Sequence, residues 1–183
     1  SSTTVFLFNK NLNLIKKISK QHKQIYHNKD WVEHDADEIY KNLLTIVKKL
    51  VKKISYHKHL FVSITNQRET FVIFDTKTGK PLHNAIVWQC RRGKKICNII
   101  AKSKSKSKFI KNLTGLELDT YFPASKLSWL LKNNKQLAKK LKNGSALFGT
   151  IDTYLIYRLT NTKSYFTDFT NAPRTLFFDN KKL

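Results

Sequence analysis

A short polar segment between two apolar runs constrains the fold more than any other part of this 183-residue chain. Residues 60–64 (LFVSI) and 70–74 (TFVIF) are rich in aromatic and β-branched side chains, which predicts strands that are buried or half-buried. Between them lie the polar residues 65–69 (TNQRE), where an arginine and a glutamate stand side by side. Binding and catalytic groups collect at such strand-to-loop junctions. A surface turn with an ion pair worth about 0–1 kcal/mol is the alternative.

Strand-like and helix-like segments alternate along the chain, and this alternation predicts an α/β fold. Further strands are expected at residues 4–8, 12–18 (a hairpin) and 146–149. Helices are expected at residues 36–54, 91–101 and 152–157, and one begins at Pro123.

Some local features refine this pattern. Asp35 is expected to cap the helix at 36–54, and His34 beside it is interpreted as a structural histidine. The lysine–serine alternation of residues 102–108 is expected to be solvated and mobile. The last third of the chain is expected to run strand, helix, strand.

The composition argues against a specific nucleic-acid reader. The net charge is +23, but only five of the 35 basic residues are arginines, and lysine is spread over the whole chain. Proteins that read bases and phosphates favour the planar fork of arginine. We therefore expect only salt-sensitive, non-specific adhesion to polyanions.

Cysteine content and hydropathy suggest a cytoplasmic protein. Cys90 and Cys97 form neither a metal-type pair nor a disulfide framework, which suits a reducing compartment. No apolar run approaches the roughly 20 residues that a membrane span needs. The chain has no methionine, so its first residue is not expected to be an initiator and the sequence is expected to be part of a longer protein.

Several stretches resemble the FGGY family of carbohydrate kinases. Residues 63–70 (SITNQRET), continuing through 75–82 (DTKTGKPL) and 84–92 (NAIVWQCRR), resemble the branch that phosphorylates glycerol. Residues 121–130 (YFPASKLSWL) fit a signature of the family. Residues 167–175 (TDFTNAPRT) match a third segment, with Pro173 where serine is usual. The resemblance implies an actin/ribonuclease H-like domain, with residues 1–183 forming most of the N-terminal domain of a two-domain kinase.

The same resemblance implies a reaction and a substrate site. The reaction is transfer of the γ-phosphoryl group of ATP to glycerol, with Mg²⁺, giving sn-glycerol 3-phosphate. The implied glycerol-binding residues are Arg68, Glu69, Trp88 and Tyr121. An arginine donor and a carboxylate acceptor can hold adjacent hydroxyls with charge-assisted bonds. Trp88 would offer a wall for the carbon chain and Tyr121 a hydroxyl. Taken alone, a tryptophan at this place would more often be a core residue.

The nucleotide side is less complete in these residues. Ser1, Ser2 and Thr4 resemble the tail of the family's phosphate loop, and Thr4 stands where a basic residue is usual. The resemblance places the general base outside this sequence, so no catalytic residue and no metal ligand is assigned here. Residues 1–183 alone are expected to be inactive, and the complete protein is expected to be a homo-oligomer.

Two other functions remain open at this point. One is an FGGY kinase acting on another polyol or sugar, which the Arg68–Glu69 pair and Trp88 disfavour. The other is a degenerate, non-catalytic basic remnant, which Thr4 and the extreme charge favour.

Overall fold

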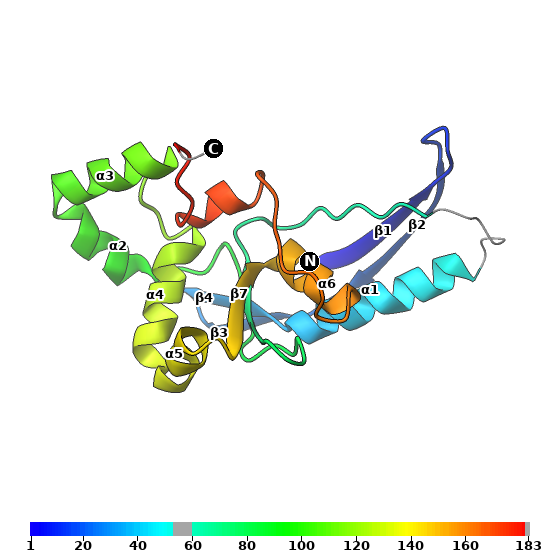
Figure 1. Cartoon of the computed structure of the whole chain (residues 1–183), viewed down its shortest axis with the longest axis horizontal. Coiled ribbons are helices and arrows are strands. Elements are labelled where there is room, and N and C mark those ends of the chain that lie inside the picture. The colour runs from blue at the N-terminus through cyan, green and yellow to red at the C-terminus, as the bar shows by residue number, and fades with distance from the viewer. Residues whose placement is uncertain (53–59, 182–183) are drawn as a thin grey trace.

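The computed structural model describes residues 1–52 and 60–181, and in these residues the chain alternates strands and helices (Figure 1). The strands are β1 (Ser2–Phe8), β2 (Leu14–Gln21), β3 (Gln24–Asn28), β4 (Trp31–His34), β5 (Phe71–Asp75), β6 (Ala85–Ile86) and β7 (Ala146–Thr150). The helices are α1 (Ala36–Val51), α2 (Lys94–Ala101), α3 (Lys104–Thr114), α4 (Pro123–Asn133), α5 (Lys135–Lys142), α6 (Ile151–Leu159) and the short 3-10 helix η1 (Ala172–Thr175). The predicted α/β class is confirmed.

The strands form two separate antiparallel sheets. β1 and β2 make the predicted hairpin, and the other five strands form a sheet in the order β3-β4-β6-β5-β7. The hairpin turn is closed by the Asn9 side chain, which accepts hydrogen bonds from the backbone N–H groups of Asn11 and Asn13. In Figure 1 the hairpin and α1 extend together at one end, away from α2 to α5.

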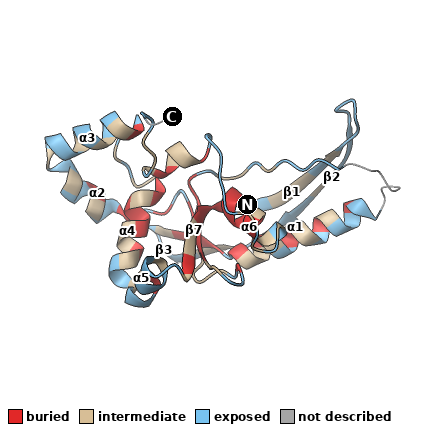
Figure 2. Ribbon diagram, in the orientation of Figure 1, coloured by how far each residue is buried: buried red, intermediate tan, exposed pale blue. Residues whose placement is uncertain are grey.

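Strand β5 is the centre of the hydrophobic core. Its first four residues are buried, and their side chains alternate between two clusters on opposite faces of the sheet. In Figure 2 buried residues concentrate around β7, α4 and α6. Phe71 and Ile73 pack with α4 and α5, whereas Val72 and Phe74 pack with α1 and α6. Burial of each such side chain is worth about 1.5–3 kcal/mol. The prediction of a buried strand at residues 70–74 is therefore confirmed.

Two helix starts follow the predicted capping chemistry. The Asp35 carboxylate accepts hydrogen bonds from the backbone N–H groups of Asp37 and Glu38, so it caps α1 as expected. Pro123 occupies the first turn of α4, where its missing N–H costs nothing. The predicted end of the first helix at residue 54 lies outside the described residues.

The strand predicted at residues 60–64 is wrong. Residues 60–64 have no strand assignment, and the side chains of Phe61 and Val62 are 94% and 75% exposed. β-branched and aromatic residues favour a strand only where a sheet edge and a covering layer receive them. Within the described residues, neither the hairpin nor the five-stranded sheet pairs with this segment.

Two further expectations are corrected. Most of residues 102–108 belong to helix α3, which Ser103 caps at its start and Gly115, at φ +72°, ends in the left-handed region. Ser103 thus acts as a helix cap, and the lysines are exposed as expected. Residues 167–175 form turns and η1 in place of a strand, because the Asp168 carboxylate accepts hydrogen bonds from the backbone N–H groups of Thr170 and Asn171.

None of the helices within residues 1–52 and 60–181 combines the length and the apolar character required of a membrane span.

One buried polar pair lies where the hairpin meets the larger sheet. The rings of His22 and His34 meet edge to face at 4.6 Å, and the Gln67 amide nitrogen lies 3.2 Å from His34 Nδ1. Burial, followed by the charges of His22 and the N-terminal amine, lowers the pKa of His34 to about 4. His34 is therefore a neutral, structural histidine.

The His34 pKa predicts a loss of stability in mild acid. An unfolded histidine titrates near 6.5, so the unfolded state takes up a proton that folded His34 refuses until about pH 4. The free energy of unfolding should fall by roughly 3 kcal/mol as the pH drops across that window. Burial also lowers the pKa of His22, which acts in the same direction.

Urea unfolding of wild type and His34→Gln between about pH 7 and pH 4 measures this effect. The variant should show a shallower pH dependence. Ile46→Val, a buried and non-titrating position on α1, is the control, because it should lower the stability without changing the pH dependence. Equal slopes for wild type and His34→Gln would contradict the assignment.

Candidate functional site

The pairing of β5 with β6 places Glu69 and Trp88 at one edge of the sheet. Phe71 pairs with Ile86 in antiparallel register, so the residue two before Phe71 and the residue two after Ile86 leave the sheet at the same end. Thr70 joins the two segments there, because its hydroxyl oxygen accepts a hydrogen bond from the Trp88 backbone N–H at 3.2 Å. The polar loop therefore starts from a fixed, buried position.

Glu69 is buried and makes its ion pair with an arginine far away in the sequence. The Arg174 Nε, on η1, donates to Glu69 Oε1 at 2.6 Å. The Arg174 Cζ also lies 4.9 Å from the centre of the Phe122 ring and 5.7 Å from that of Tyr121. Arg174 thereby connects Glu69 to the start of α4.

Trp88 and Tyr121 form an aromatic pair beside this ion pair. Their ring centres are 5.4 Å apart and the rings are tilted by 53°. Trp88 is 37% exposed and belongs to neither core cluster, so the alternative that it is a core residue is not supported. The two rings give a partly open apolar surface next to a carboxylate.

Arg68 stands apart from the other three predicted substrate residues. Its side chain is exposed, and within the described residues it makes no hydrogen bond and no ion pair. The predicted alternative, a surface ion pair of Arg68 with Glu69, is not formed, because Glu69 bonds to Arg174. Arg68 keeps its five donors available to solvent.

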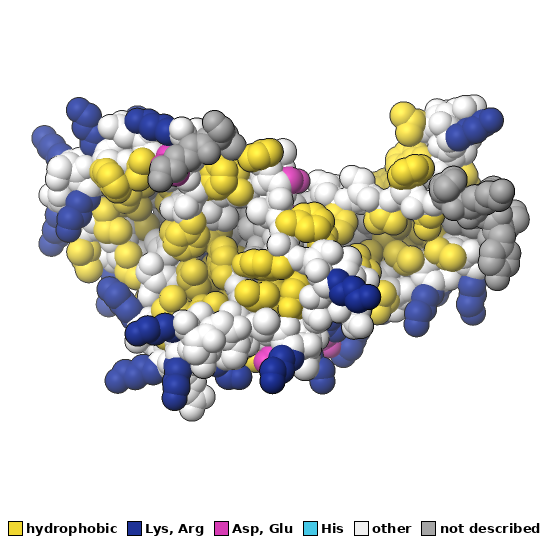
Figure 3. All heavy atoms as spheres, viewed as in Figure 1, with side chains coloured by type: hydrophobic (Ala, Val, Ile, Leu, Met, Phe, Trp, Pro, Cys, Tyr) yellow, Lys and Arg dark blue, Asp and Glu magenta, His cyan; other side chains and the backbone are white. Residues whose placement is uncertain are grey.

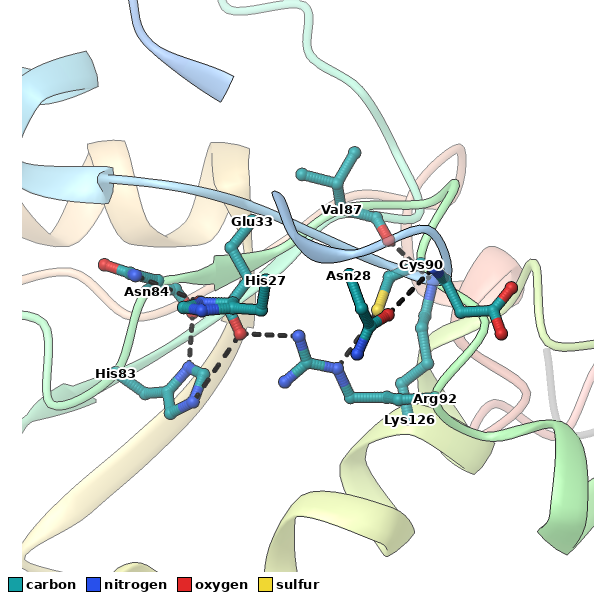
Figure 4. Close-up of polar contacts among 10 residues, drawn as sticks. His27, Asn28, Glu33, His83, Asn84, Val87, Cys90, Arg92 and Lys126 are labelled. Atoms are coloured by element: carbon teal, nitrogen blue, oxygen red, sulfur yellow. Dashed lines mark hydrogen bonds and ion pairs between the residues drawn. The ribbon is translucent and has the colours of Figure 1, made fainter. Parts of the chain in front are cut away.

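Lys126 forms hydrogen bonds to the backbone of both residues of the aromatic pair. It is fully buried on α4, and its ammonium nitrogen donates to the backbone carbonyls of Tyr121 at 2.9 Å and Trp88 at 3.3 Å. The third acceptor is the Val87 carbonyl at 3.2 Å (Figure 4). Burial lowers the pKa of Lys126 to about 7. Sequence analysis singled out neither Lys126 nor Arg174, although both lie in stretches that carry the family resemblance.

A second buried charge network lies next to this edge and holds β4 to the segment after β6. Glu33 pairs with Arg92 and also contacts His27 and Asn84 (Figure 4). Burial opposes ionisation of Glu33, but hydrogen bonds from Asn84, Arg92 and His27 hold its pKa below the usual value. This network orients the chain that carries Trp88.

Arg92 is also enclosed by aromatic rings. Its Cζ lies 4.6 Å from the centre of the Trp31 ring and 5.3 Å from that of Trp129. The guanidinium group is therefore held by an ion pair with Glu33 and by two aromatic rings.

The predicted nucleotide residues lie at the start of β1. Gln24 Nε2 donates to the Ser1 hydroxyl at 3.0 Å, and the hydroxyls of Thr4 and Ser19 are 2.8 Å apart. Among the described residues, no hydrogen bond joins Ser1, Ser2 or Thr4 to the predicted substrate residues. Residues 1–52 and 60–181 also hold no group of three histidine, cysteine or acidic side chains that would suit a metal ion.

An apolar groove of about 460 Å³ lies beside α4 and η1, the elements that carry Lys126 and Arg174. It is lined by residues of α4, β7, α6 and the C-terminal segment, among them Leu127, next to Lys126, and Thr175, next to Arg174. Figure 3 shows hydrophobic side chains gathered across the middle of this face of the molecule, with lysines and arginines around its rim. Positive charge thus surrounds an apolar interior on this face.

Comparison with known proteins identifies the family of this chain. A family model described as the N-terminal domain of the FGGY family of carbohydrate kinases matches residues 1–183. A glycerol kinase of Fusobacterium nucleatum is 42% identical over 185 residues, covering 100% of this chain and 37% of that protein. A glycerol kinase of Leptospira biflexa is 45% identical, covering 95% of this chain and 35% of that protein. The chain thus spans little more than a third of these relatives.

Solved structures show the same likeness. Plasmodium falciparum glycerol kinase with ADP has a TM-score of 0.89 at 38% identity, covering 100% of this chain and 36% of that one. Gluconate kinase from Lactobacillus acidophilus has a TM-score of 0.82 at 26% identity, covering 97% and 34% of the two chains. The expected fold class is confirmed. The chain belongs to the FGGY family of carbohydrate kinases, whose N-terminal domain it matches along its whole length.

Proposed function

We propose that this chain provides the glycerol-binding side of an ATP-dependent glycerol kinase, which transfers the γ-phosphoryl group of ATP to a terminal hydroxyl and forms sn-glycerol 3-phosphate. The observation that carries the proposal is the single sheet edge at which Glu69, Trp88 and Tyr121 lie together with Arg174. The curated relatives described above are glycerol kinases, which supports the same choice of substrate.

The polar groups at this edge suit a small uncharged triol. Arg174 bonds to Glu69 Oε1, and within the described residues Oε2 accepts no hydrogen bond, so it is available to a substrate hydroxyl. Arg68, one residue earlier, has an exposed side chain, which would turn toward the edge to give its donors to hydroxyl oxygens. A carboxylate acceptor beside an arginine donor gives charge-assisted bonds, which are stronger than neutral ones.

The aromatic pair supplies the apolar part of the site. Trp88 and Tyr121 form a bent wall that fits a three-carbon chain, and the Tyr121 hydroxyl adds a polar contact. Phosphoryl transfer depends mostly on positioning and on stabilising charge. The contribution of these residues is to bind glycerol and to hold one terminal hydroxyl in a fixed place.

We propose that parts of the protein outside these residues bind most of the ATP molecule and supply the general base. The hydroxyls of Ser1, Ser2 and Thr4 are the candidate nucleotide contacts in this chain. Within residues 1–52 and 60–181 no group of three histidine, cysteine or acidic side chains lies together, so the phosphates of ATP are proposed as the main ligands of Mg²⁺. Mg²⁺ commonly binds through substrate phosphates and one or two carboxylates.

The other readings are weaker. Gluconate kinase shares the fold at 26% identity, below the 42% and 45% of the glycerol kinases, so a different FGGY substrate is less well supported. A degenerate remnant is less well supported, because the buried Glu69–Arg174 ion pair and the partly open aromatic pair beside it are both intact. The proposal extends to a cytoplasmic, homo-oligomeric enzyme, and the two free, buried cysteines suit a reducing compartment.

The substrate contacts predict specific kinetic losses in the complete enzyme. Arg68→Ala and Glu69→Gln each remove a charge-assisted bond to a glycerol hydroxyl, so each should weaken glycerol binding by about 1.5–3 kcal/mol. That corresponds to roughly 10- to 150-fold in affinity. A coupled assay of glycerol-dependent ADP release measures it. Lys108→Gln, on the exposed part of α3, is the control for loss of charge, and wild-type KM and kcat in either site variant would contradict the assignment.

Arg174 predicts a combined loss of stability and binding. Arg174→Ala leaves the buried Glu69 carboxylate without its partner, at a cost of about 1–3 kcal/mol in the free energy of unfolding. The KM for glycerol should rise because Glu69 is no longer held at the edge. Arg91→Ala removes the same charge from an exposed position and should change neither quantity. An unchanged KM in Arg174→Ala would show that Glu69 needs no support.

A further inference from the structure

Lys126 is a fully buried lysine, and packing alone does not explain why a charged side chain lies there. Burying an ammonium group is costly unless hydrogen bonds replace its water. A leucine or methionine would fill the same space on α4 without that cost. Its three acceptors are all backbone carbonyls, from Val87, Trp88 and Tyr121.

These carbonyls come from two separate segments. Val87 and Trp88 follow β6, whereas Tyr121 precedes α4. Trp88 lies 38 residues from Lys126 in the sequence, and Tyr121 lies five residues from it. Within the described residues, no backbone–backbone hydrogen bond joins the two segments. The ammonium group is thus the polar link between the two segments that carry the aromatic pair.

We propose that Lys126 is a positioning residue of the glycerol site, which fixes the backbones of Trp88 and Tyr121 at one point so that the two rings form one wall. This inference rests on the proposed function. It assigns Lys126 no contact with the substrate. Its effect passes through the two rings.

The protonation state of Lys126 bears on this role. An ammonium group has three N–H donors, one for each carbonyl, whereas a neutral amine has two. Burial and the charge of Arg92 lower the pKa of Lys126, and Cys90, Glu69 and Asp119 oppose that change, with a resulting pKa of about 7. Raising the pH above 7 should therefore remove one donor and weaken glycerol binding.

Steady-state kinetics of the complete enzyme test the proposal. Lys126→Met keeps the length of the side chain and removes its donors, and kcat/KM for glycerol should fall about 10- to 100-fold, chiefly through KM, with the KM for ATP unchanged. Leu130→Ala, also buried on α4, is the matched control. It should lower the melting temperature and leave the KM for glycerol unchanged. An unchanged KM in Lys126→Met, or an equal rise in Leu130→Ala, would overturn the proposal.

The pH profile of the wild type needs no variant to fold. Its KM for glycerol should rise between about pH 7 and pH 9, in line with loss of the ammonium proton. A KM that stays flat over this range would contradict the requirement for three donors.

Fluorescence separates this proposal from the proposed function. The difference in emission between a protein and its Trp88→Phe variant isolates Trp88. Acrylamide should quench that emission more strongly in Lys126→Met than in Leu130→Ala. If wild type shows no glycerol-dependent ADP release but Trp88 behaves in this way, the proposed function fails and the positioning by Lys126 stands. Equal quenching would overturn the positioning whatever the activity.

Discussion

The pairing of Phe71 with Ile86 is the contact on which the candidate site depends. β6 has only two residues, so hydrogen bonds alone hold it weakly, and its position follows from burial, with Phe71 1% and Ile86 0% exposed. A slip of one residue would turn the side chains of β6 to the opposite faces of the sheet. Glu69 and Trp88 would then no longer meet at one edge. The hydrophobic core therefore fixes the polar geometry.

The sequence could predict the elements that depend on local pattern. β5 appeared as an apolar run, α1 as a helical stripe behind an Asp cap, and α4 as a helix starting at Pro123. Residues 60–64 have an equally strong strand composition, yet they lie exposed because no sheet edge receives them. Composition indicates what a segment can form, and its tertiary neighbours decide whether it does.

The site shows the same division. Arg68, Glu69, Trp88 and Tyr121 were identified through resemblance, but the groups that hold them could not be read from spacing. Arg174 lies 105 residues from Glu69, and Lys126 acts through backbone carbonyls, which carry no sequence signal of their own. The contacts of a buried lysine depend on how α4 packs, and that packing is known only once the chain is folded.

Arginine and lysine have different places in this molecule. Three of the five arginines make ion pairs between distant parts of the chain: Arg92 with Glu33, Arg158 with Asp37 and Arg174 with Glu69. Each also lies over an aromatic ring, an arrangement that suits a planar guanidinium and not a compact ammonium. The +23 charge is thus carried mainly by surface lysines, while the acids at these three places are matched by arginine.

This separation bears on how so basic a surface can coexist with the proposed selection of glycerol, an uncharged substrate. A positive surface field attracts anions such as ATP and speeds their arrival, in a way that salt weakens over a Debye length of about 8–10 Å. The field does not act in this way on glycerol, which carries no charge. Discrimination among polyols must then come from the few groups at the sheet edge, where Glu69, Trp88 and Tyr121 are held by buried contacts that salt screens far less.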